Sequence, residues 1–251
     1  ITFSANLFGY GYESNGLGTT QMMNAQRQHA YSYNLVSKSE SSSTHFNANF
    51  DYQRSFKKKG EYLTFSYRYG TSPNTNESHT DYDDIKDYPY DASYLYNQFY
   101  DNHSRTDEHI FQLDYTNPIN KVHSIDFGGK YILRNNKSES DYFKRSVTSN
   151  DYYLDERPES YYQQIHHIAS AYADYMVKTK KLSAKAGVRY EHTFSDVKYE
   201  KMPERNFDAG FDNLVPSVRL GYQLAPSKML SFSYQMRIAR PNINLLNPFR
   251  N

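Results

Sequence analysis

Polar and apolar side chains alternate with a period of two residues in segments along the whole chain. The clearest case is 182–194, whose apolar face carries Leu182, Ala184, Ala186, Val188 and Tyr190 and whose polar face carries Lys185 and Arg189. Successive side chains of a β-strand point to opposite faces, so each such segment predicts a strand with one apolar face. We expect about nine strands, at roughly 1–12, 43–56, 61–70, 108–117, 122–134, 165–178, 182–195, 213–224 and 228–238.

The expected connections alternate between short and long. Short ones fall near 57–60, 117–121, 179–181 and 225–228, and long ones fill 13–43, 70–108, 135–165 and 195–213. This alternation is typical of an antiparallel up-and-down transmembrane β-barrel with short periplasmic turns and long outer loops. A soluble β-sandwich also alternates its faces and remains a further alternative. It would not usually keep all its long loops at one end, and long structureless loops are uncommon in compact domains.

The odd strand count predicts a piece of a larger barrel, because bacterial single-chain barrels have even strand numbers. We therefore expect 1–251 to be one partial, all-β barrel domain, and an excerpt of a longer protein, since nothing near Ile1 resembles a signal peptide. The apolar faces, including Leu63, Phe65, Tyr67 and Tyr69, should contact lipid. Arg68, Lys185 and Arg189 should face the lumen, because an arginine at a lipid-facing midplane costs about 2–4 kcal/mol.

Composition narrows the class further. The chain has 27 Tyr and 15 Phe, an aromatic content that argues against disorder despite a mean hydropathy of −0.91. It has no run of 18 apolar residues, which excludes a transmembrane helix. Cysteine is absent, which excludes disulfides, thiolate metal sites and a thiol nucleophile. The net charge of +1 gives no reason to expect nucleic acid as a partner.

No catalytic or metal-binding pattern stands out, and we expect neither an enzyme nor a cofactor or metal. His166 and His167 are adjacent, so on a strand they point to opposite faces and cannot share one metal ion. The acidic run 81–87 suggests Ca²⁺, but Ile85 and Lys86 stand where an EF-hand needs a ligand and a glycine. A Ser/His/Asp hydrolase stays an alternative without support, because no G-x-S-x-G elbow is present.

Charged and aromatic residues are concentrated in the expected loop 70–108, which contains nine acidic residues and only two basic ones, Lys86 and Arg105. The acidic residues either increase solubility or bind cations, sugars or lipopolysaccharide that is bridged by divalent ions. Exposed aromatic rings can stack on sugars or anchor a protein ligand, or they can extend the hairpins as cross-strand pairs. The candidate ligand-contacting residues are Asp83, Asp84, Asp87, Tyr88, Tyr90, Tyr94, Tyr96, Tyr152 and Tyr153.

These tyrosines come from two expected loops, 70–108 and 135–165, that leave the barrel two strands apart. We expect them to converge at the outer mouth. The resulting surface would be concave, lined by tyrosine and negatively charged. Because field focusing in such a cleft repels anions, it would favour neutral sugars or cationic peptides.

Several motifs resemble a known family. Residues 107–118 with 124–134, and 171–175 with 185–191, resemble two hairpins of the outer-membrane β-barrel family of TonB-dependent receptors, which includes SusC-like proteins. The most specific part is 213–249, with 213–217 and 230–240 followed by the family motif residues Arg240, Pro241, Asn242, Leu245, Leu246, Asn247, Pro248 and Phe249. We also expect Arg237–Phe249 to interrupt regular strand pairing, because proline lacks a backbone donor, although a plain outer-loop start fits equally well.

The resemblance implies a 22-strand barrel with a plugged lumen in the outer membrane of a Gram-negative bacterium. It implies uptake of a large nutrient, with energy from the TonB complex through a part not present in this chain. It also implies contact with outer-membrane lipid or lipopolysaccharide, and with a surface lipoprotein. The alternative is a surface binding or structural barrel that does not transport.

Overall fold

In the computed structural model, which describes residues 1–238, nine long strands form one antiparallel sheet and a tenth, very short strand lies beside it. The part of the chain described contains three short 3₁₀ helices and no α-helix. The strands are β1 (Thr2–Met23), β2 (His29–Ser55), β3 (Tyr62–Lys86), β4 (Tyr96–Pro118), β5 (His123–Ser146), β6 (Tyr153–Leu154), β7 (Tyr162–Lys178), β8 (Leu182–Tyr199), β9 (Phe207–Ala225) and β10 (Lys228–Gln235). The 3₁₀ helices are η1 (Ala92–Tyr94), η2 (Pro158–Ser160) and η3 (Pro203–Arg205).

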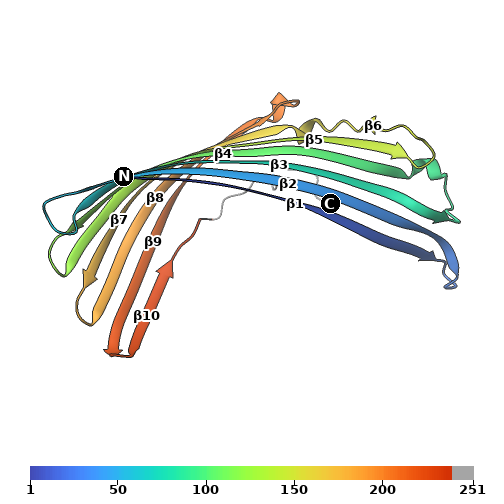
Figure 1. Ribbon diagram of the computed structural model, residues 1–251. Coiled ribbons are helices and arrows are strands. Elements are labelled where there is room, and N and C mark those ends of the chain that lie inside the picture. The colour runs from blue at the N-terminus through green and yellow to red at the C-terminus, as the bar shows by residue number, and fades with distance from the viewer. Residues whose placement is uncertain (239–251) are drawn as a thin grey trace.

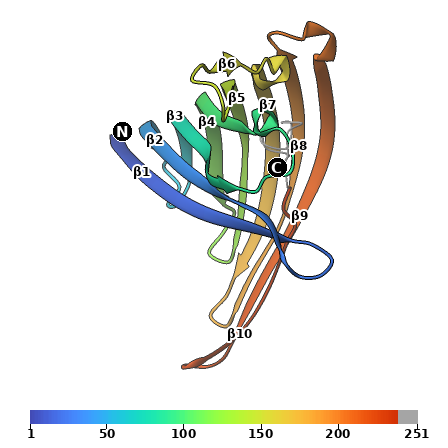
Figure 2. The ribbon, with the colours of Figure 1, turned by 90° about the vertical axis from the view of Figure 1, so that its right-hand side faces the viewer.

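Each strand pairs with the next along the chain, in the order β1-β2-β3-β4-β5-β7-β8-β9-β10, and β6 pairs with β5. The sheet curls into an open trough, with β1 and β10 at its two edges (Figures 1 and 2). The expected all-β, up-and-down antiparallel class is therefore confirmed. The 22-strand total remains a prediction.

The expected bounds of the long loops are wrong, although the strands do continue past the bilayer into these segments, as the sequence also led us to expect. Most of 13–43, 70–108, 135–165 and 195–213 is strand, and the outer connections shrink to 24–28, 87–95, 147–161 and 200–206. A two-residue hydrophobic period does not reveal these strand extensions, because both faces of the outer halves of the strands are polar. The backbone is instead paired residue by residue with its neighbour, as in the serine-rich register from Ser37↔Thr80 to Ser43↔Asn74. Apart from β6 and β10, the strands have 17–27 residues, whereas about 9–11 span a bilayer.

The two faces of the trough differ in exposure. In β8 the burial of Glu191, Thr193 and Val197 alternates with the exposure of Tyr190 and Phe194. Within residues 1–238 no second layer covers this sheet, so the buried face is the concave one, where side chains converge and shield each other. The exposed face is convex.

The predicted assignment of residues to faces is confirmed. Lys185 lies on the concave face, where its Nζ is 3.1 Å from Asp174 Oδ2, and Arg189 lies on the same face two strand repeats further along β8. Val188 and Tyr190 are 43% and 49% exposed on the convex face. The same registers place Leu63, Phe65, Tyr67 and Tyr69 of β3 on the convex side, and Arg68 on the concave side.

Candidate ligand-binding site at the outer mouth

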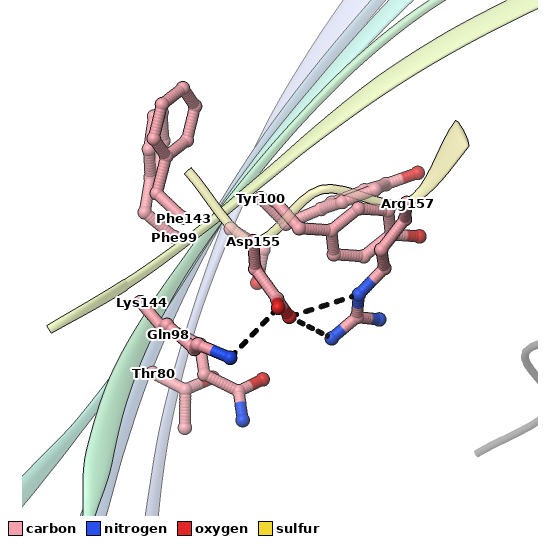
Figure 3. A pocket seen from close by; sticks show the side chains of 10 residues that line it. Thr80, Gln98, Phe99, Tyr100, Phe143, Lys144, Asp155 and Arg157 are labelled. Atoms are coloured by element: carbon pink, nitrogen blue, oxygen red, sulfur yellow. Dashed lines mark hydrogen bonds and ion pairs between the residues drawn. The ribbon is translucent and has the colours of Figure 1, made fainter. Parts of the chain in front are cut away.

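A hollow of about 370 Å³ lies at the outer ends of β4 and β5, under the segment 147–161 (Figure 3). The register places most of the side chains that line it on the concave face. Phe99 and Phe143 are on the opposite side of the ribbon, stacked with their ring centroids 5.6 Å apart. The hollow is lined by Ser78, Thr80, Gln98, Phe99, Tyr100, Tyr142, Phe143, Lys144, Asp155 and Arg157.

Asp155 is the electrostatic centre of the hollow. Its carboxylate accepts a hydrogen bond of 2.8 Å from Lys144 Nζ, and two from Arg157, at 3.1 Å from Nε and 2.9 Å from Nη2 (Figure 3). The backbone N–H of Asp155 also donates to the carbonyl oxygen of Tyr142 at 2.7 Å. The hydrogen bond from Lys144, followed by that from Arg157, holds the pKa of the Asp155 carboxyl below its usual value.

Aromatic rings surround these charges. The Arg157 guanidinium lies over the Tyr142 ring, 4.1 Å from its centroid, and the Tyr142 and Tyr100 rings are 4.8 Å apart. Lys144 Nζ lies 5.7 Å from the Tyr96 centroid and 5.5 Å from that of Tyr153. Cations over aromatic faces are attracted by the ring quadrupole, so these contacts fix both the rings and the charges.

A second hollow, of about 330 Å³, shares Tyr142, Asp155 and Arg157 with the first. Its far wall includes Tyr161, whose hydroxyl donates to Asp141 and whose ring centroid lies 3.2 Å from Lys201 Nζ. Two adjoining hollows with rings, hydroxyls, an amide and fixed charges can stack on a ring-shaped ligand and hydrogen-bond its hydroxyls.

The predicted candidates fall into two groups. Tyr96 and Tyr153 come together in an edge-to-face pair at 6.3 Å beside the first hollow. Tyr152 lies on the convex side under Arg145, which also pairs with Asp81 at 3.4 Å.

None of the nine predicted candidate residues lines either hollow. Asp84 pairs with Lys86 at 2.8 Å, and Asp87 lies 3.7 Å from His29. Tyr88 packs edge-on against Tyr31 at 5.4 Å. Asp83, Tyr90 and Tyr94 are exposed, the two tyrosines by 71% and 72%.

The expectation of a single acidic surface from 70–108 is wrong. The acidic residues lie on both faces and most pair with nearby bases, as Asp107 does with Arg105 and Glu108 with Arg134. The sequence reading missed Lys144, Asp155 and Arg157. The sequence gives one local indication of this cluster: Asp155 and Arg157 are two residues apart, and side chains at that spacing lie on the same face of an extended segment.

The family motif residues at 240–249, and most of the predicted interruption at Arg237–Phe249, lie outside the described residues. Among residues 1–238, no group of three or more His, Asp or Glu side chains could hold a metal ion. His166 is buried on the concave face, and His167 bonds to Tyr131 on the other face. No helix within the described part of the chain is long and apolar enough to cross a membrane.

A comparison of the sequence with models of known protein families identifies one family. A sequence model of the outer membrane protein beta-barrel family matches residues 54–251. No curated protein matches the chain.

Solved structures with a similar fold include the ferric citrate transporter FecA (8% identity, TM-score 0.43), the siderophore receptor PiuA from Acinetobacter baumannii (10%, 0.46) and the ferric yersiniabactin uptake receptor FyuA from Yersinia pestis (12%, 0.37). They cover 90%, 93% and 88% of this chain, which spans 40%, 45% and 40% of theirs.

Proposed function

The chain belongs to the outer membrane protein beta-barrel family and so lies in the bacterial outer membrane, and from this premise we propose that it forms part of the wall of a TonB-dependent uptake receptor. Its ligand is a nutrient too large for porins. Sequence supports the receptor type through the motif residues from Arg240 to Phe249, which resemble those of such receptors. The adjoining hollows at the outer mouth support ligand capture.

The single observation that carries the proposal is the composition of those hollows. Tyr100 and Tyr142 offer ring faces, while Ser78, Thr80 and Gln98 offer hydroxyl and amide groups. The charges there are already paired with each other, so the site suits a neutral, hydroxyl-rich ligand better than a strongly charged one. An oligosaccharide has this chemistry, because its rings stack on tyrosine and its hydroxyls replace bound water.

The position of the site fits capture from the outside. From Leu133, where the continuous run of apolar residues on the convex face of β5 ends, to Tyr142 is nine residues, or roughly 30 Å along the strand. At a strand tilt of about 45°, this places the hollows about 20 Å above the hydrocarbon. A ligand held there has not yet entered the membrane, as the first step of uptake requires.

Transport needs parts beyond this wall. We propose that the TonB complex acts through a segment that this chain does not include, and that a surface lipoprotein assists capture. In this mechanism the outer hollows bind the ligand, and remodelling of a plug in the lumen lets it pass. The alternative is a barrel that binds at the surface without transport.

The test is growth and uptake in the source bacterium. The gene is deleted, and strains are compared on a panel of oligosaccharides supplied as the only carbon source. We expect loss of growth on one glycan class in the deletion strain and in a strain without TonB. Growth unchanged in both strains on every glycan would refute glycan uptake, and binding that persists while uptake never depends on TonB would select the alternative.

Tyr142→Ala tests the site itself. Loss of one stacked ring, worth about 0.5–1.5 kcal/mol beyond its buried area, should weaken binding of the glycan that the growth screen identifies by roughly threefold to tenfold. Tyr94→Ala is the control, because this ring is 72% exposed and lines neither hollow. Equal affinity of the two variants would place the binding site elsewhere.

A further inference from the structure

Five tyrosine rings form a chain of contacts at the outer ends of β2 and β3 and in the connection that follows β3. The distances between ring centroids are 6.4 Å from Tyr31 to Tyr33, 5.1 Å from Tyr33 to Tyr82, 5.4 Å from Tyr31 to Tyr88 and 5.8 Å from Tyr88 to Tyr90. We call these five residues the tip cluster. None of them lines either of the two ligand hollows.

The tip cluster begins on the concave face, directly beyond the first hollow. Tyr82 is two residues beyond Thr80 and four beyond Ser78 on β3, and the latter two residues line that hollow. Alternate residues of a strand share a face, so the ring of Tyr82 continues the wall of the hollow outward. The convex face of β3 at the same height carries the charged residues Asp81 and Asp83 instead.

Hydroxyl and ring side chains connect the hollow to the end of the tip cluster. Ser39 of β2 and Ser78 of β3 meet through hydroxyls 2.9 Å apart, and further out Leu35 pairs in register with Tyr82. From Ser39 to Tyr31 is eight residues, or about 26 Å along β2. The concave surface therefore carries a long track that starts at the hollow and ends in tyrosine rings.

The hydroxyl groups of the tip cluster differ from those of tyrosines nearer the membrane. The hydroxyls of Tyr67, Tyr131 and Tyr175 each share a hydrogen bond with a histidine ring, at 2.9, 2.7 and 2.6 Å. Within residues 1–238, no hydroxyl of the tip cluster is hydrogen-bonded to another protein group. These hydroxyls bond to water and can exchange that water for the hydroxyls of a ligand.

The arrangement of the rings leaves aromatic surface uncovered. Three of the four contacts are edge-on, with interplanar angles of 61°, 87° and 73°. An edge-to-face pair covers one ring face, whereas a stacked pair covers two. Tyr90 is 71% exposed, and the other four tyrosines are partly exposed. The tip cluster thus presents ring faces together with free hydroxyls.

We propose that the tip cluster is a second part of the ligand site, and that the ligand is a linear, neutral sugar chain. One end of the chain lies in the hollows. The following sugar units run outward along β2 and β3, over Tyr82, Tyr33 and Tyr31. This inference rests on the glycan ligand proposed above and adds chain length as the property that the receptor selects.

Charge and length both favour this occupant. Beside the tip cluster, Asp84 pairs with Lys86 at 2.8 Å and Asp87 lies 3.7 Å from His29. A neutral chain leaves these pairs intact, whereas a strongly charged ligand would compete with them. A compact ligand would fill a hollow and leave the rings of the tip cluster unused, but a chain can contact both.

Binding is measured by isothermal titration calorimetry on the detergent-purified protein, as the bacterium makes it. The probes are linear oligosaccharides of glucose, mannose and xylose, each as a disaccharide, a tetrasaccharide and an octasaccharide. Each further stacked ring should tighten binding by roughly threefold to tenfold. In the series that binds, we expect the octasaccharide to bind at least about tenfold more tightly than the disaccharide, because it reaches two or more rings of the tip cluster.

Variants separate the two parts of the site. Tyr33→Ala combined with Tyr88→Ala should reduce the advantage of the octasaccharide to about threefold or less. It should leave the affinity for the disaccharide unchanged, which also shows that the hollows remain intact. Tyr142→Ala should weaken all lengths by a similar factor. Tyr94→Ala is the control, because this ring is 72% exposed at the same end of the sheet and belongs to neither part of the site.

The failure of this inference can be told apart from the failure of glycan uptake. Equal affinity for the disaccharide and the octasaccharide would overturn the extended site and leave glycan binding in the hollows in place. A length advantage that survives the replacement of Tyr33 and Tyr88 would equally overturn it, as would an equal loss of affinity for both lengths. Binding of no probe at any length would overturn the inference together with the glycan ligand.

Discussion

Asp155→Asn should release the segment 147–161 from the concave face. The substitution keeps the size of the side chain and the backbone hydrogen bond from the residue 155 N–H to the carbonyl oxygen of Tyr142, but it removes the charge that Lys144 and Arg157 share. The segment would then be held by its pairing with β5, at Phe143↔Leu154 and Lys144↔Tyr153, and by its aromatic contacts.

The size of the effect follows from the exposure of the three groups. The side chains of Lys144, Asp155 and Arg157 are 34%, 26% and 26% exposed, so the pairs are stronger than fully exposed ones but still screened by water. Charge-assisted bonds in a two-pronged arrangement contribute more than a single pair. We expect a loss of about 1–2 kcal/mol, which makes local opening roughly 5–30 times more frequent.

Hydrogen–deuterium exchange of the segment measures that opening. Exchange in 147–161 should speed up by this factor in Asp155→Asn, while β4 and β5 near the membrane remain unchanged. Asp151→Asn is the matched control, because it removes the same charge from an exposed position in the same segment.

The pH dependence gives an independent check on the same carboxyl. Hydrogen bonds from Lys144 and then Arg157 hold the pKa of Asp155 below its usual 3.8. A depressed pKa means that the stabilisation is complete at neutral pH and is lost as the pH falls below 3.8, through the depressed value. After correction for intrinsic exchange, acid should open the segment in the wild type and have no further effect in Asp155→Asn. Equal exchange in Asp155→Asn and Asp151→Asn at neutral pH would refute the reasoning.

Two further substitutions test the sheet itself. Gly128→Ala should lower the free energy of unfolding by about 1–3 kcal/mol, because its Cβ would lie 2.5 Å from the carbonyl oxygen of Leu113, whereas Gly129→Ala meets nothing closer than 3.5 Å and should be nearly neutral in thermal unfolding. Val188→Arg places a charge on the convex apolar face and should lower the free energy of folding into a bilayer by about 2–4 kcal/mol. Thr64→Arg, on the concave face, is its control. Equal losses of folding free energy in the two variants would contradict the assignment of faces.

The membrane-depth half of the sheet could be read from the sequence, because lipid on one side and polar groups on the other impose a strict period of two. Leu182 to Tyr190 follow that rule, and the structure places them accordingly. The outer half could not be read in this way. At Ser39 and Ser78, for example, the two strands meet through a hydroxyl–hydroxyl contact of 2.9 Å, and neither position carries a hydrophobic signal.

The candidate site was only partly predictable for a related reason. Tyrosines gathered in two segments suggested that those segments meet, and Tyr96 and Tyr153 do so. The position of Asp155 between Lys144 and Arg157 depends on how 147–161 folds back over β5. The way in which this connection folds back over β5 is not encoded in a repeating pattern of polar and apolar residues, so the sequence does not predict it.

The rigidity of the outer half explains how such a site can stand far above the membrane. Asn102 of β4 donates to the hydroxyls of Ser138 and Ser140 of β5 at 3.0 and 2.7 Å, and all three residues are buried. Buried polar groups that are satisfied by one another fix the register, since a slip would leave them unpaired at a cost of about 1–3 kcal/mol each. Tyr100 and Tyr142 continue the same cross-strand ladder outward. The wall of the first hollow formed by β3, β4 and β5 is therefore built on paired strands, which hold side chains more precisely than a loop of equal length would.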